Sequence, residues 1–278
     1  MRVNVNIAEE LGDGLADLDG PPSMTKAEAL TLIKRASISR LLEQDIVGRD
    51  SYYLMLSHDI PIPATKLNED VLCTRSAIEN TDGATLLFRI AQKGLASNIP
   101  KKYLTQRSLM LRNKKGHTTL ALLAACGELA LVPKKLLTQE NLLKPDVANK
   151  TAFLAACAHS FSAIPPELLT EANLLERDNE GFSGFHALAL SGNLGKLPAE
   201  LLTFENLTLQ DNSQGRPLVI AGIRKTAQEL SIFQRGNVLT MTEQTKKAWL
   251  KAFGKMEKPA TLLEDFTHVE KHGSWQEL

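Results

Sequence analysis

Two histidines lie four residues apart near the C-terminus, as His268 and His272. On a helix this spacing places both imidazoles on one face, where they can chelate a zinc ion. A zinc protease also requires a glutamate directly after the first histidine; Val269 stands there, and no third ligand is evident in the sequence. The pair is therefore interpreted as chance spacing, and no metal or other cofactor is predicted.

The three cysteines, Cys73, Cys126 and Cys157, are an odd set without metal-ligand spacing. Cys157 falls among small apolar residues, which favours a buried hydrophobic side chain over a reactive thiol. The sequence has no phosphate-binding Gly-x-x-x-x-Gly-Lys-Ser/Thr loop, no Gly-x-Ser-x-Gly elbow and no Cys-x-x-Cys pair. We therefore predict a protein without enzymatic activity.

A sequence repeat occupies the middle of the chain, and its units must position the residues that bind a partner. Its prolines are spaced by 37, 33, 32 and 33 residues, at Pro63, Pro100, Pro133, Pro165 and Pro198. Four of them are followed by a Leu-Thr pair, at Leu104-Thr105, Leu137-Thr138, Leu169-Thr170 and Leu202-Thr203. A fixed period of this length indicates a solenoid, in which each unit buries its apolar face against its neighbours.

A second landmark keeps the same period. Turns with positive φ are predicted at Gly83, Gly116, Asn149, Gly181 and Gly215. A Thr or Ser two residues later, as at Thr118, can cap a helix rich in leucine and alanine. A small residue then ends that helix, at Gly94, Gly127, Ser160 and Gly192.

The chain resembles the ankyrin repeat family, whose pattern is Asp-x-x-Gly-x-Thr-Pro-Leu-His-x-Ala-Ala-x-x-Gly. The copy that matches best keeps Asp178, Gly181, Ser183, Phe185, His186, Ala189 and Gly192. The resemblance covers residues 63–230 and implies an all-α, ankyrin-like helical repeat solenoid of about five to six units with helical caps. The copies are of a divergent bacterial or phage type. The resemblance also implies that His186 hydrogen-bonds loop backbone.

The second half of each copy departs from the family pattern, as in Pro133-Lys134-Lys135-Leu136-Leu137-Thr138. Proline fits the first turn of a helix, and threonine can cap a new one. The second helix is therefore expected to be short and followed by an extra helical turn.

The flanks of the repeats are predicted to act as caps, which the end units of a solenoid need. Residues 1–24 form an acidic N-terminal arm, and residues 25–62 form an N-terminal helical cap and a degenerate first repeat with Tyr52 and Leu54 in its core. Ankyrin-like repeats occupy residues 63–230. Residues 231–278 form a C-terminal helical cap that includes a basic amphipathic segment at 242–258. Binding of nucleic acid or of a membrane surface by that segment is the alternative to capping.

Ankyrin-like units present their turn tips and the inner face of the first helix as a concave surface, so the resemblance implies a binding site there. The candidate partner-binding residues are Lys114, Lys115, His117, Lys150, Glu180, Phe182 and Arg216. Phe182 and Arg216 are the most suggestive, because aromatic residues and arginine dominate binding hot spots. The lysines favour an acidic partner. Solvated loop tips without function are the alternative.

The repeats and the family resemblance imply a non-enzymatic scaffold that binds, sequesters or inhibits an unknown protein partner. The formal net charge is +0, which makes nucleic acid an unlikely partner. No apolar run is long enough for a membrane span, and the N-terminus lacks the pattern of a signal peptide. A cytoplasmic location is expected, in the protein's own cell or, if it is delivered, in a host cell. The alternative is a targeting or delivery module whose flanks carry an unrecognised activity.

Overall fold

The computed structural model describes residues 25–45, 49–75, 82–217 and 220. These residues form an all-α structure: they contain α-helices, 3-10 turns and four isolated β-bridges, but no β-strand. The acidic arm at 1–24, the expected cap at 231–278, its basic segment, His268 and His272 lie outside the described residues. The chain divides into two compact bodies, Met1–Ala156 and Cys157–Leu278, here called the N-terminal body and the C-terminal body.

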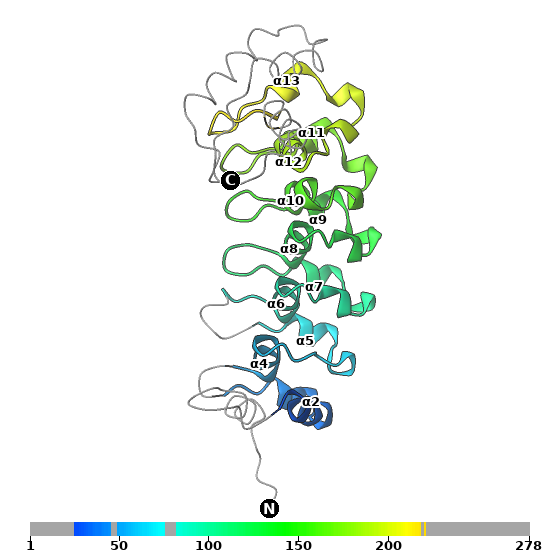
Figure 1. Ribbon diagram of the computed structural model, residues 1–278, viewed down its shortest axis with the longest axis vertical. Helices are drawn as coiled ribbons and strands as arrows, with labels where there is room; N and C mark the ends of the chain where they lie inside the picture. The colour runs from blue at the N-terminus through cyan, green and yellow to red at the C-terminus, as the bar shows by residue number, and fades with distance from the viewer. Residues whose placement is uncertain (1–24, 46–48, 76–81, 218–219, 221–278) are drawn as a thin grey trace, which may run out of the picture. The chain divides into compact units, whose positions relative to one another are not determined.

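Short helices and 3-10 turns (η) alternate in both bodies (Figure 1). In the N-terminal body they are α2 (Lys26–Arg35), α3 (Ile38–Leu41), α4 (Ser51–Ser57), η1 (Ala64–Lys66), α5 (Glu69–Cys73), α6 (Leu86–Gln92), η3 (Ala96–Asn98), η4 (Lys101–Tyr103), α7 (Gln106–Met110), α8 (Thr119–Ala125), η5 (Leu129–Leu131), η6 (Lys134–Leu136) and α9 (Gln139–Leu142). Helix α10 (Ala152–His159) begins at the end of this body. The C-terminal body continues with η7 (Phe161–Ala163), η8 (Pro166–Leu168), α11 (Glu171–Leu175), α12 (Gly184–Ser191), η9 (Leu194–Lys196), η10 (Ala199–Leu201) and α13 (Phe204–Leu207).

Side-chain caps set where the first helix of each copy begins. The Thr118 side chain accepts a hydrogen bond from Ala121 N (3.1 Å) and starts α8. Thr85 does the same for α6, and Asp50 for α4 through Tyr53 N (2.7 Å). A cap of this kind satisfies an amide that has no partner inside the helix. The predicted threonine caps are therefore confirmed at Thr85 and Thr118, and Asp50 performs the same role in the first copy.

The second half of each copy consists of short turns in succession, as expected, but it begins with a 3-10 turn where a short α-helix was predicted. Each proline precedes a 3-10 turn instead of entering an α-helix, as Pro133 does before η6. The threonine that follows caps a separate short α-helix; Thr138 caps α9 through Asn141 N (3.3 Å). The Asn141 amide also donates to Leu136 O (2.8 Å), which ties the two turns together. The side-chain amides of Asn173 and Asn206 donate equivalent bonds to Leu168 O and Leu201 O. In another copy the Ser108 hydroxyl donates the equivalent bond to Tyr103 O.

Positive φ occurs at four of the five predicted turns: Gly83 (65°), Gly116 (79°), Asn149 (59°) and Gly181 (76°). The fifth prediction is wrong, because Gln214 (66°) occupies the left-handed position instead of Gly215. The hydrogen bonds show the same shift: Gln214 N donates to Asp211 O (3.1 Å), as Gly181 N donates to Asp178 O (3.0 Å). Gly215 is therefore equivalent to Phe182, one residue past the turn.

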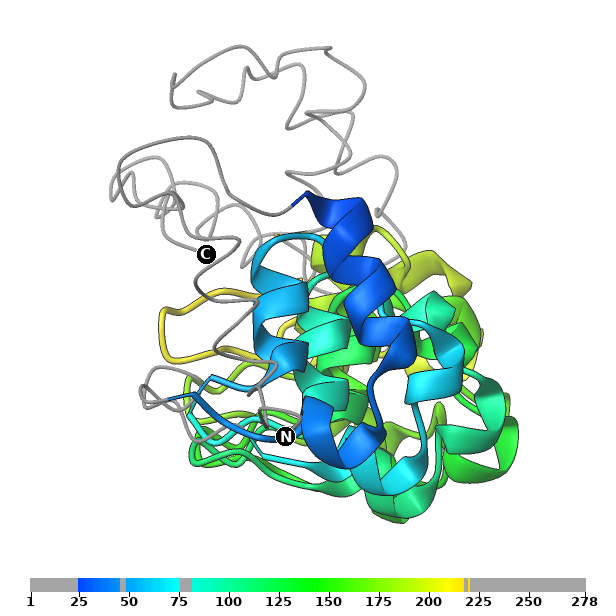
Figure 2. The ribbon, with the colours of Figure 1, turned by 90° about the horizontal axis from the view of Figure 1, so that it is seen from below.

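Leucine and alanine form the core of each copy, as the composition predicts. Tyr52 and Leu54, the predicted core of the first copy, are fully buried, and the Tyr52 hydroxyl donates to Lys66 O (2.7 Å). In the N-terminal body α6 packs directly against α8. Figure 2 shows the hairpins of this body on one side of these helices and the short turns on another. Consecutive copies therefore present equivalent residues in the same direction.

Candidate functional site

In each body, the hairpin tips that join one copy to the next are the candidate interaction surface. Four tips have the same construction, at residues 113–117, 146–150, 178–182 and 211–215. In each, the first residue is Asn or Asp, and its Oδ1 accepts two backbone N–H groups of the tip. Asp146 Oδ1, for example, accepts from Ala148 N and Lys150 N, both at 2.8 Å. Such a brace gives a tip a defined shape before any partner arrives.

These bracing residues were not identified as a set in the sequence. They are Asn113, Asp146, Asp178 and Asp211. The signal was present, because Asn or Asp stands three residues before each left-handed position. It was recognised only at Asp178, where the family pattern includes an aspartate.

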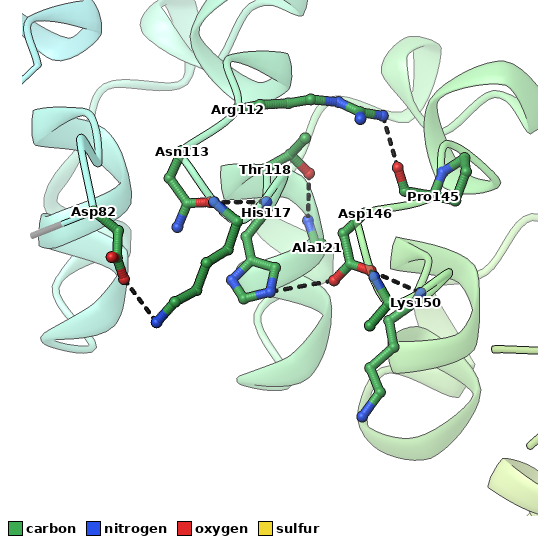
Figure 3. Close-up of polar contacts among 11 residues, drawn as sticks. Asp82, Arg112, Asn113, His117, Thr118, Ala121, Pro145, Asp146 and Lys150 are labelled. Atoms are coloured by element: carbon green, nitrogen blue, oxygen red, sulfur yellow. Dashed lines mark hydrogen bonds and ion pairs between the residues drawn. The ribbon is translucent and has the colours of Figure 1, made fainter. Parts of the chain in front are cut away.

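Neighbouring tips of the N-terminal body are bonded to one another (Figure 3). Lys114 N donates to Asp82 O (2.8 Å), and the Lys115 ammonium lies 2.8 Å from the Asp82 carboxylate. Further along, His117 Nε2 lies 3.2 Å from Asp146 Oδ2. One carboxylate, that of Asp146, thus braces its own tip and contacts the histidine of the preceding tip.

Electrostatics on this side are dominated by cations. The hydrogen bond from Lys115 lowers the pKa of Asp82 below its ordinary value, and the charge of Lys114 acts in the same direction. Asp82 therefore stays ionised near neutral pH and offsets part of the positive charge of the tips. The side chains of Lys114, Lys115 and Lys150 are exposed, and that of His117 is half-buried.

An exposed hydrophobic residue lies among these cations. Val147 occupies the second position of its tip and is 71% exposed. Val147 is not among the partner-binding residues predicted from the sequence. A tip that presents both lysine and valine can contact a partner through charge and through apolar surface.

Two of the three candidate residues in the C-terminal body lie differently from expectation. Glu180 is exposed at its tip. Phe182 is half-buried, and its ring stacks on His186 with centroids 5.2 Å apart. It therefore has a structural role in addition to any role in binding. Arg216 does not stand at the position of Phe182: Ile220 N bonds to Arg216 O (3.0 Å), as Ala187 N bonds to Ser183 O, so Arg216 occupies the helix-capping position.

His186 has the loop-bonding role that the resemblance implies. Its Nδ1 accepts from Ser183 N (3.2 Å) and lies 2.7 Å from the Ser183 hydroxyl, while Nε2 lies 3.2 Å from Gly215 O. This arrangement fits a neutral imidazole with the proton on Nε2. Burial lowers the pKa of His186, although the bond to the Gly215 carbonyl acts in the opposite direction. Both nitrogens are occupied by structural contacts.

The described residues offer little material for other chemistry. They contain no group of three or more His, Cys, Asp or Glu side chains placed to hold a metal ion. Cys157 is buried as predicted, and burial raises the pKa of its thiol to about 12. Within the same part of the chain, no helix is long and apolar enough to cross a membrane.

Comparisons with known proteins leave the family open. No model of a known protein family matches the sequence, and no curated protein matches it. A chain in the solved complex of Bd0816, a predatory endopeptidase of Bdellovibrio bacteriovorus, with the immunity protein Bd3460 is similar at 16% identity and a TM-score of 0.35. The similarity covers 84% of this chain and 100% of the other. A likeness of this degree does not establish a shared fold or function.

Proposed function

We propose that the copies are divergent ankyrin-type repeats that form a helical solenoid, and that the protein is a non-enzymatic scaffold binding a protein partner through its hairpin tips. The observation that carries the proposal is the construction of the tips. Each is braced by an Asn or Asp side chain and exposes other side chains to solvent. A surface that is already ordered loses little conformational entropy on binding, which favours affinity.

The charge of the N-terminal body supports an acidic partner. Over the full sequence, Met1–Ala156 contains 20 Lys and Arg against 17 Asp and Glu, an excess of three positive charges. Cys157–Leu278 contains 12 Lys and Arg against 15 Asp and Glu. Complementary charge steers encounter and selects among partners more than it sets the final affinity. Lys114 and Lys150, exposed on consecutive tips, are placed to contact carboxylates of the partner.

The test begins with a pull-down from the native host, identification of the captured proteins by mass spectrometry, and affinity measurement with each purified candidate. The variant K114E/K150E reverses two tip charges without removing a bracing residue. Its matched control is K26E/K34E, which makes the same change in net charge on α2. We expect the tip variant to bind at least about tenfold more weakly than the control.

Equal affinity of the tip variant and the control would show that the partner uses another surface. Since Lys115 is paired with Asp82 and supports the hairpin, it is left unchanged in both variants. Thermal unfolding of both variants establishes that the folds are intact.

A further inference from the structure

A second set of lysines lies away from the tips, on the proline-led turns of the N-terminal body. Turns η4 and η6 each begin with two lysines after a proline: Lys101 and Lys102 in η4, and Lys134 and Lys135 in η6. The corresponding turns of the C-terminal body carry Glu167 and Glu200 and no lysine. Charge at this position of the copy therefore differs between the two bodies.

All four lysines are exposed, and none forms an ion pair with any described residue. The ammonium of Lys102 lies over the ring of Tyr103, 4.8 Å from its centroid. Acidic groups of the preceding copy are already engaged: Asp70 with Arg107 (2.6 Å), and Glu69 with the Thr105 hydroxyl (2.5 Å). The positive charge of these turns is thus not neutralised by the carboxylates that precede them.

The separation of the two lysine pairs follows from the packing of the helices that carry them. Helices α6 and α8 precede η4 and η6 and pack directly against each other, so equivalent residues are about 8–10 Å apart. Three residues of an extended chain span about 10 Å. An extended segment in the polyproline II conformation has three residues per turn and a rise of about 3.1 Å per residue, so carboxylates at every third residue lie on one face and match this step. Figure 1 shows these turns on the side of α6 and α8 away from the hairpins, so the surface is separate from the tips.

We propose that Lys101, Lys102, Lys134 and Lys135 form a second interaction surface, the lysine edge, which binds an acidic, extended segment of a protein. An acidic protein is favoured over nucleic acid for two reasons. The edge contains no arginine, whose planar fork suits phosphate. Cys157–Leu278 of the same chain also has three more acidic than basic residues, which opposes a long polyanion more than a short acidic segment.

The experiment measures binding of fluorescein-labelled poly-L-glutamate to the full chain by fluorescence anisotropy, at low and at high salt. The edge variant is K101Q/K102Q/K134Q/K135Q. The matched control, K26Q/K34Q/K93Q/K144Q, removes the same charge from dispersed positions of the same body. We expect the wild type to bind poly-L-glutamate in a salt-sensitive manner. The edge variant should bind about tenfold more weakly than the control.

Equal weakening of the two variants would overturn the proposal, because net charge alone would then explain binding. Tighter binding of a poly-dT oligonucleotide than of poly-L-glutamate, lost in the edge variant, would overturn the choice of partner. If the fourfold edge variant fails to fold, K101Q/K102Q and K134Q/K135Q are measured separately. The tip variant K114E/K150E makes the same change in net charge as the edge variant, so equal weakening of poly-L-glutamate binding in these two variants would also overturn the proposal.

Discussion

Gly116 offers a direct test of how tightly neighbouring hairpin tips pack. Its φ is +79°, which costs a residue with a side chain about 1–2 kcal/mol. A Cβ added there would also lie 3.2 Å from Val147 N and 3.3 Å from the Cα of Asp146. These are backbone atoms of the next tip, so relief requires the hairpins to separate, and overpacking of this kind costs about 1–3 kcal/mol. We expect Gly116→Ala to lower the free energy of unfolding by about 2 kcal/mol or more.

The matched control is Gly94→Ala in the same body. Gly94 has nearly the same backbone, with φ at +69°, but nothing lies within 4 Å of an added Cβ. Its substitution should therefore show the backbone cost alone, about 1–2 kcal/mol. Urea unfolding followed by far-UV circular dichroism measures both variants against the wild type. If the two substitutions cost the same, the contact between tips contributes nothing, and the proposed ordering of the tips is wrong.

Two further substitutions address the braces and the buried histidine. Asp146→Ala removes two bonds to its own tip and the contact with His117, so we expect a loss of about 2 kcal/mol in urea unfolding; Asp146→Asn keeps an Oδ1 acceptor and should lose less. For His186, burial lowers the folded-state pKa below the unfolded value of 6.5. The unfolded chain therefore binds more protons below about pH 6.5, and stability falls as pH drops through that value. His186→Asn should be less stable at pH 7 but should lose less on going to pH 5, whereas an equal pH dependence in both proteins would contradict the assignment.

Most of the helix caps and tight turns were predicted correctly from short sequence signals. The threonine caps and the glycine turns each depend on a few adjacent residues, and Thr118 and Gly116 both have the predicted roles. The error at Gly215 has a physical cause. Glycine fits positive φ best, but Gln214 adopts it because Asp211 accepts the amides of Ser213 and Gly215 and holds the tip in shape. The hydrogen bonds to the Asp211 side chain thus outweighed the intrinsic preference of glycine for positive φ.

The candidate site was predicted less well, because exposure depends on neighbouring copies. Phe182 was expected to be an exposed anchor, yet it stacks on His186, a residue of the following helix. Val147 was not selected as a candidate binding residue, although it is the more exposed apolar side chain. Position within the tip explains Val147, because the second residue of each of the four tips is exposed. At the fifth position exposure varies: Lys150 is exposed, whereas Phe182 lies against the following helix. The periodic pattern alone does not show this difference.

Net charge was the least informative quantity, since it averages over parts that a partner never contacts together. At physiological ionic strength, interactions between exposed charges are screened beyond about 8 Å. A partner on the tips or on the lysine edge therefore responds to the nearest few side chains. The total of +0 combines an excess of three basic residues over Met1–Ala156 with an excess of three acidic residues over Cys157–Leu278. Neutrality of the whole chain argues against strong binding of long polyanions, but it does not argue against an acidic protein that contacts the N-terminal body alone.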